Sequence, residues 1–393
     1  MKLAILFGEE YDLTTFSHPG GDESIKYIYH IPDATPYYMS YHREDKSFLQ
    51  THLAKYKTGI TKIELYDYEK YNLLKTLVYS HILSRKLNTY YRTNDILLLL
   101  AIATAIIILL TTNWFIFHFF AGLLNVGFSI GLLHSAGHMS IHKRFNTTLY
   151  KIGAITSGLI PLDAWRLNHN YFHHIFTGDE LDADRDNYQS HLQTHPLSKY
   201  PKHKYSTIKK CAYIFALFIF PGQWFGLIRQ HYKWIVLGGG IRGFIGILNK
   251  SKYMDVISIL TIILFGSYVL IKPVSCCISF FIGMNITFTC IVLPNHASND
   301  TYNSIQTNTN CWATKQITES ANYSMDNYVI THIFGGINFQ IEHHLFPKLP
   351  PHLLVEIQPI VMKFCKENNI KYNSFSNVMF GIISGIQNIF IHN

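Results

Sequence analysis

The chain has 393 residues, a formal net charge of +8, and only 15% charged residues against 48% hydrophobic ones. So few charged residues are unusual for a soluble globular protein. The positive charge does not suggest nucleic acid, because no basic stripe with interleaved aromatic residues accompanies it. An excess of Lys and Arg is also what an anionic membrane surface attracts. We therefore expect a membrane partner and no nucleic acid.

Residues 1–72 are predicted to form a small soluble α+β module. Turn residues at Pro19-Gly20-Gly21 separate strand-like from helix-like segments. The expected strands are Leu3–Phe7 and Glu10–Leu13, and the expected helical segments are Asp22–Tyr29 and Ser47–Lys57. A tyrosine-rich, basic connector over 73–94 follows, which suits a helix lying against lipid headgroups.

Two histidines in this module, His18 and His42, lie about two dozen residues apart. A six-coordinate haem needs two axial imidazoles on opposite faces, and such a pair can supply them. The glycines after His18 allow a tight turn and a close approach of the backbone to a ring. An isolated His-Pro-Gly-Gly sequence could equally be a solvent-exposed turn.

Two long apolar blocks follow the connector. Ile96–Leu133 has no charged residue, and Val256–Leu293 has only Lys272. Each block is about twice the ~20 residues that one spanning helix needs, so each is predicted to be a hairpin. The expected spans are 95–112, 114–133, 254–271 and 274–293.

The distribution of Lys and Arg predicts the orientation of these spans. Of the 33 Lys and Arg, only Lys272 falls within the hairpins. The positive-inside rule then places both termini and the central loop on the cytoplasmic face. The apolar stretch Ala212–Ile228, interrupted by Pro221-Gly222, is expected to form an interfacial or re-entrant pair with Trp234–Leu248; six spans would preserve the same orientation.

Three histidine clusters lie just beyond the apolar blocks, on the face predicted to be cytoplasmic. They contain His134 and His138; His169, His173 and His174; and His343 and His344. Residues i and i+4 of a helix share a face, so the rings of the first pair, and those of His169 and His173, can point to one side. Adjacent histidines diverge by about 100°, which favours two metal ions over one.

Ligand type alone leaves zinc, copper, iron and nickel open. Zinc has no redox chemistry that could use electrons from a haem, so the haem-like module favours iron. The acidic run Asp179–Asp186 lacks the glycine and terminal Glu of a calcium loop. We expect a solvated turn there that can hold the second-cluster ligands from behind.

The N-terminal module resembles cytochrome b5. The resemblance rests on Tyr11–Phe16, on His18-Pro19-Gly20-Gly21, on Asp33-Ala34-Thr35 and on the interval from His18 to His42. It implies that His18 and His42 are the axial ligands of haem b.

The segment Ser80–Glu356 resembles the membrane-bound fatty acid desaturases, in particular the front-end branch that is fused to cytochrome b5. The run Gly335–Pro347 carries most of this likeness, and in it Gln340 stands where other desaturases have a histidine. Ser135 stands where an acidic residue is usual. The resemblance implies two non-haem iron ions held by His134, His138, His169, His173, His174, His296, Gln340, His343 and His344.

The fold expected from all of this is mainly α. A cytochrome b5-like haem domain (1–72) and a connector (73–94) precede an α-helical membrane domain (95–393) with four spans and a cytoplasmic histidine-rich cap. The implied activity is O2-dependent insertion of a cis double bond into a lipid acyl chain, between an existing double bond and the carboxyl end. Electrons would come from an NADH-dependent cytochrome b5 reductase, and the location would be the endoplasmic reticulum.

Several alternatives stay open at this stage. A sphingoid-base desaturase or a di-iron lipid hydroxylase would share the histidine clusters. A membrane electron carrier would use only His18 and His42, and a zinc hydrolase would need neither oxygen nor haem.

Overall fold

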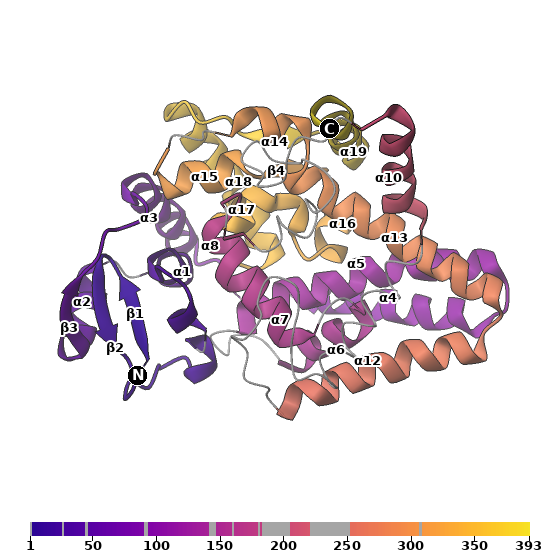
Figure 1. Ribbon diagram of the computed structural model, residues 1–393, viewed down its shortest axis with the longest axis horizontal. Helices are drawn as coiled ribbons and strands as arrows, with labels where there is room; N and C mark the ends of the chain where they lie inside the picture. Colours follow the sequence, from indigo (N-terminus) through magenta and orange to yellow (C-terminus); the bar gives the residue numbers. More distant parts are fainter. Residues whose placement is uncertain are drawn as a thin grey trace.

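The structure is a computed structural model, and the molecule is mostly helical (Figure 1). The structure describes residues 2–25, 27–43, 46–89, 93–140, 147–158, 161–179, 181–182, 205–220, 252–305 and 309–393. A small sheet module and a cap of short helices lie at one end of the long apolar helices.

The N-terminal module is built on a three-stranded antiparallel sheet in the order β1-β2-β3. The strands are β1 (Leu3–Leu6), β2 (Glu9–Asp12) and β3 (Lys57–Thr61). The β1–β2 hairpin turns through Phe7 (φ 52°) and Gly8 (φ 71°), the two positive φ values that tight hairpins favour. The two predicted strands are therefore confirmed, each within one residue.

The segment expected to be helical over Asp22–Tyr29 is helical in two pieces and is not one α-helix. Two separate 3-10 turns occur instead, η1 (Asp22–Ser24) and η2 (Ile28–His30). The buried residues Ile25, Ile28 and Ile31 repeat every three residues, which suits the three residues per turn of 3-10 geometry. The module is completed by α1 (Thr35–Tyr41), α2 (Lys46–Leu53) and η3 (Ala54–Tyr56).

The connector forms helix α3 (Glu69–Ser84), which packs against the cap. Tyr71, Leu74, Val78 and Ile82 are buried, at the three- and four-residue spacing of one helix face. The Tyr71 hydroxyl donates to the Leu345 carbonyl at 2.6 Å. One face of the connector is thus covered by protein, and its contact with lipid stays a prediction.

Four apolar helices occupy the positions of the predicted spans. They are α4 (Thr93–Thr111), α5 (Phe115–Ser140), α12 (Lys252–Ile271) and α13 (Val274–His296). Among the described residues, the segments Phe115–His134 and Val274–Ser304 are long and apolar enough to cross a membrane, whereas the apolar parts of α4 and α12 are shorter. The count of four spans therefore stays a prediction.

The turns of the two hairpins meet at the end remote from the cap (Figure 1). The Lys272 ammonium donates to the Thr112 carbonyl at 2.9 Å and to Asn113 Oδ1 at 3.2 Å. His118 contacts the same Thr112 carbonyl at 3.0 Å and the Tyr268 hydroxyl at 2.6 Å. The only charge in the second apolar block is therefore bound to the first turn, and both hairpins run in the same direction.

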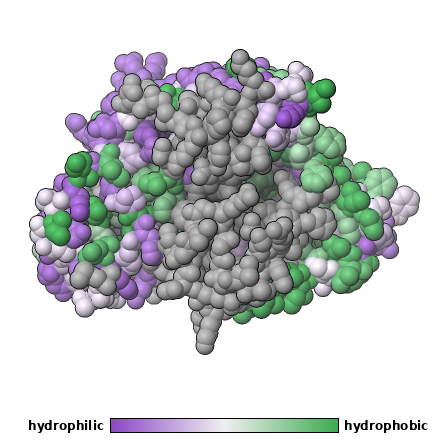
Figure 2. All heavy atoms as spheres, viewed as in Figure 1, coloured by the Kyte–Doolittle hydropathy of each residue, from purple (hydrophilic) through white to green (hydrophobic). Residues whose placement is uncertain are grey.

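Helices α5 and α13 pack at close range because glycines lie at their crossing. A Cβ at Gly122 would lie 2.1 Å from the Phe280 carbonyl oxygen, and one at Gly283 would lie 2.3 Å from that of Phe119. The outward faces of the four helices carry large exposed apolar residues such as Leu100, which gather on the right of Figure 2. This is the surface expected for a helix bundle in lipid.

The cap is built from the central loop and the C-terminal segment. Its elements are α6 (Thr147–Ser157), α7 (Leu162–Arg166), η4 (Leu167–His173), α8 (His174–Phe176), α10 (Thr207–Ile219), α14 (Asn299–Ser304), α15 (Trp312–Thr318), β4 (Ala321–Tyr323), α16 (Tyr328–Ile333), η5 (Ile337–Phe339), α17 (Gln340–Leu345), α18 (Pro351–Glu367), β5 (Asn373–Phe375) and α19 (Val378–His392). Strands β4 and β5 pair in parallel.

Helix α10, at the start of the predicted re-entrant pair, packs against α13. Asn285 Nδ2 and Thr289 Oγ1 both donate to the Leu217 carbonyl, at 3.0 and 2.6 Å. The segment predicted to pair with Ala212–Ile228 is Trp234–Leu248, and it lies outside the described residues.

Candidate metal centre

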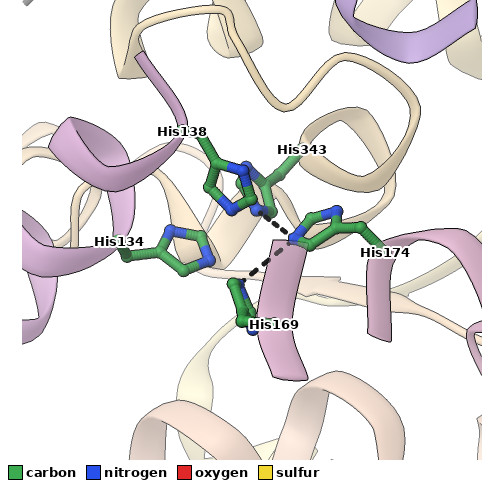
Figure 3. A group of neighbouring side chains, drawn as sticks. All are labelled: His134, His138, His169, His174 and His343. Carbon is green, nitrogen blue, oxygen red and sulfur yellow. Dashed lines mark hydrogen bonds between the residues drawn. The ribbon is translucent and has the colours of Figure 1, made fainter. Parts of the chain in front are cut away.

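Eight histidines from all three clusters and from the end of α13 converge in the cap. They form two groups, and within each group one nitrogen of every ring lies within 4.8 Å of the others. The first group is His134, His138, His169, His174 and His343 (Figure 3), and the second group is His173, His296 and His344. Every histidine predicted as an iron ligand is present in one of the two.

The ends of α5 and α17 supply their histidines in the way the sequence predicts. His134 and His138 are one turn apart on α5, with ring centroids 5.2 Å apart, and both join the first group. The adjacent residues His343 and His344 of α17 divide between the two groups. His173 and His174 divide in the same way, so the divergence of neighbouring rings is confirmed.

The rings of His169 and His173 do lie on one side, with centroids 5.2 Å apart, but the two residues belong to different groups. Residues Leu167–His173 form a π-helix, and the His174 amide donates to the His169 carbonyl, five residues back. This wider turn also brings residues i and i+5 close together. His169 therefore shares the first group with His174, and their Nε2 atoms are 3.2 Å apart. His173 faces the second group.

The spacing of nitrogens in the first group fits a metal ion. His174 Nε2 lies 3.2 Å from His169 Nε2 and 3.0 Å from His343 Nε2. Two nitrogens that each lie ~2.1 Å from one ion, at right angles, are ~3.0 Å apart. His138 Nε2 is buried and has no hydrogen-bond partner among the described residues. Buried polar atoms rarely lack a partner, and a metal ion bound to His138 Nε2 would provide one.

Each ring of the second group is held through Nδ1 by an oxygen acceptor. Asp182 Oδ1 lies 3.0 Å from His173 Nδ1, the Glu319 carbonyl 2.8 Å from His296 Nδ1, and Gln316 Oε1 2.9 Å from His344 Nδ1. Acceptors of this kind place the ring proton on Nδ1, so that Nε2 is the nitrogen that would bind a metal. The expectation that the acidic run holds second-cluster ligands is confirmed for Asp182.

Gln340 lies between two rings of the second group. Its Nε2 atom is 2.8 Å from His296 Nε2 and 2.9 Å from His344 Nε2, and its Oε1 accepts from Asn295 Nδ2 at 3.2 Å. The amide thus reaches the position where the second group's lone pairs point. The side chain of Ser135, the other departure from the desaturase pattern, lies outside the described residues.

Burial favours the neutral form of three of these imidazoles. It lowers the pKa of His174, His343 and His344 well below the usual value, and the neighbouring imidazoles lower it further. Neutral imidazole is the form that binds metals. The buried Glu342 carboxylate accepts from Asn322 Nδ2 and from the Tyr372 hydroxyl, and burial nevertheless raises its pKa to about 7.

His18 and His42 face each other at the edge of the N-terminal module, with ring centroids 5.9 Å apart. Two imidazoles bound to one iron on opposite sides have centroids roughly 6 Å apart, so the pair fits a haem iron. His42 Nδ1 donates to the Tyr38 carbonyl at 3.0 Å. His18 differs, because its Nδ1 accepts from the Gly20 amide at 3.0 Å. Iron at Nε2 requires that bond to break.

The family model for fatty acid desaturases matches residues 110–376, about two thirds of the chain. The chain belongs to the fatty acid desaturase family. Curated relatives include the Delta(8)-fatty-acid desaturase of Borago officinalis, 27% identical over 94% of this chain and 85% of its own length. The probable Delta(5) fatty acid desaturase C of Dictyostelium discoideum is 26% identical over 93% of this chain and 86% of its own.

A Delta 8-(E)-sphingolipid desaturase of Komagataella phaffii is 27% identical over 64% of this chain and 50% of its own length. The desaturase described here is thus an oxidoreductase, and the names of its relatives support a front-end type. Its two histidine groups fit the di-iron centre of the family.

Several contact residues of the desaturase's centre escaped the sequence analysis. Thr177 Oγ1 lies 3.0 Å from His344 Nδ1, and the Tyr41 hydroxyl lies 2.5 Å from His138 Nδ1. Nothing in the sequence could have revealed Tyr41, because it comes from the N-terminal module, 97 residues from its partner.

Proposed function

We propose that this desaturase introduces a cis double bond into a fatty acyl chain, between an existing double bond and the carboxyl end. The observation that carries the proposal is the division of eight histidines into two adjacent groups, with Gln340 reaching the second. Two metal ions side by side suit a two-electron oxidation better than one does. His134, His138, His169, His174 and His343 would hold one iron, and His173, His296, His344 and Gln340 the other.

The chemistry has a simple balance. Removing two hydrogens from adjacent carbons and reducing one O2 to two waters takes two further electrons and two protons. When bound, the two irons would supply the O2 activation. The residues of the chain hold neutral imidazoles in fixed tautomers, and the buried cap keeps water away.

The electrons are proposed to come from an NADH-dependent cytochrome b5 reductase and to pass through haem b on His18 and His42. A supporting feature is that relatives such as the Borago enzyme align over 94% of this chain, so the alignment extends into the N-terminal module. We also propose four spans, both termini on the cytoplasmic side, and a location in the endoplasmic reticulum. The meeting of the two hairpin turns at Lys272 supports that topology.

A sphingoid base is the second candidate substrate. It is favoured by the relatives that are named sphingolipid desaturases, such as that of Komagataella phaffii. Both substrates place a long chain against the same centre, and a lipid hydroxylase would differ only in its product.

The test is expression in a host supplied with several unsaturated fatty acids, followed by mapping of new double bonds by mass spectrometry. His343→Ala removes a ring of the first group. The matched control is His52→Ala, because His52 is exposed on α2, far along the chain from the three clusters. We expect a new double bond on the carboxyl side of an existing one with the wild type and the control, and none with His343→Ala.

Other results would redirect the proposal. A new double bond in sphingoid bases alone would move the substrate to the second candidate. A hydroxylated chain would establish a hydroxylase. An unchanged product in His343→Ala would exclude the histidine groups from the reaction.

A further inference from the structure

From the N-terminal module, Tyr41, the last residue of α1, reaches the first histidine group. Its hydroxyl lies 2.5 Å from His138 Nδ1, and its ring lies over the His138 ring with centroids 6.3 Å apart. Both residues are almost fully buried. Within the described part of the chain, His138 Nε2 has no hydrogen-bond partner, so it is the atom at which this ring would bind a metal.

The next residue in the chain is His42, the proposed haem ligand. The path from the His42 ring to the His138 ring therefore runs through one stretch of covalent bonds and a single hydrogen bond. When His138 binds metal through Nε2, its proton lies on Nδ1 and is donated to the Tyr41 oxygen. The hydrogen bond then connects His138, a proposed ligand of a non-haem iron, with Tyr41, the residue next to the proposed haem ligand His42.

The end of α1 is held in this place by two buried lysines from the rest of the chain. Lys348, four residues beyond His344, donates to the Tyr41 carbonyl at 2.6 Å. Lys75 of α3 donates to the His42 carbonyl at 3.3 Å. Cations suit the carbonyls at a helix C-terminus, and burying an ammonium is costly unless it is paired. The end of α1 is therefore held by buried hydrogen bonds from two other parts of the chain.

We propose that Tyr41 is the link through which electrons pass from the haem on His42 to the iron held by the first group, and that its hydroxyl positions His138. The inference rests on the proposed function. In each transfer the haem iron loses one electron and a non-haem iron gains it, with the reductase as the source. Two transfers serve each double bond.

The test follows a single electron in the full-length protein loaded with haem and iron, without oxygen or lipid substrate. Half a molar equivalent of dithionite supplies one electron per haem, and stopped-flow absorbance follows the reoxidation of the reduced haem by the oxidised irons. Tyr41→Phe keeps the ring and removes the hydroxyl. The matched control is Tyr37→Phe, which removes a hydroxyl that contacts Tyr171 instead, at 3.2 Å. We expect the fast reoxidation phase to be lost in Tyr41→Phe and kept in the control.

A second readout is the affinity for Fe(II), measured by competition with a chelator. Loss of a partner of a metal ligand lowers metal affinity about tenfold or more, and this is expected for Tyr41→Phe. If iron binds more weakly while the iron-loaded variant reoxidises its haem at the wild-type rate, Tyr41 only positions His138 and the electron path is wrong. A wild-type rate with unchanged affinity overturns the whole inference.

Failure of the proposed function would look different. If the wild-type haem is not reoxidised by the irons, the electron relay itself fails, and with it this inference. If Tyr41→Phe does not take up haem, Lys348→Met tests the same link by releasing the Tyr41 carbonyl. It is expected to slow reoxidation, and a wild-type rate would count against the path.

Discussion

The two histidine groups differ in what holds them. All three rings of the second group donate through Nδ1 to oxygens of the cap, on Asp182, Glu319 and Gln316. In the first group, Nδ1 of His134 and of His174 has no hydrogen-bond partner in the described part of the chain. The second group is thus fixed by the desaturase domain alone. The first group contacts the N-terminal module through Tyr41. We therefore expect electrons from that module to reach the first group.

The largest effect should follow loss of the ring at the middle of the first group. His174 Nε2 lies within 3.2 Å of two other ligand nitrogens, so His174→Ala opens that site. We expect no desaturated product and loss of iron from the first group only. Iron per chain and lipid products would be measured together. Full product from this variant would show that the first group is not part of the reaction centre.

Next in size is loss of the carboxylate behind the second group. Asp182→Asn keeps the shape of the side chain but removes the charge that holds His173. Affinity for Fe(II) should fall about 10–100-fold at one of two sites. A chelator titration would show this as one weakened site and one unchanged. The exposed Asp326 offers the control Asp326→Asn, and equal weakening of both sites would contradict the separation of the groups.

A smaller loss is expected when the amide of Gln340 is removed. Gln340→Leu preserves most of the volume but takes away the contact with His296 and His344. We expect about tenfold weaker iron binding, again at the second group, by the same titration. Unchanged affinity would mean that the amide fills space beside the metal and does not hold it.

The smallest effect should follow loss of the Thr177 hydroxyl, which forms hydrogen bonds behind the rings. The Thr177 hydroxyl lies 2.6 Å from the His173 carbonyl and 2.9 Å from Gln316 Oε1, and Thr177→Val removes it at nearly constant volume. We expect the free energy of unfolding to fall by about 1 kcal/mol, seen as a lower Tm, with iron binding retained. Loss of an iron would show that Thr177 is needed to hold the His344 ring in place.

The sequence predicted those features that depend on local spacing. The hairpin turns at Thr112 and Lys272 follow from the length of the apolar blocks, and the division of His343 from His344 follows from the 100° step of a helix. The pairing of His169 with His174 could not be predicted, because the π-turn between them is set by backbone hydrogen bonds that leave no pattern in the residues. Tyr41 could not be predicted either, since its partner is brought near only by the fold.

The ratio of non-haem iron to haem in the purified full-length protein tests the central claim most directly. Elemental analysis gives total iron and zinc, and the optical spectrum gives haem. Two histidine groups and one pair of haem ligands predict two non-haem irons for each haem. Haem without further iron, or zinc in place of the two irons, would contradict the account.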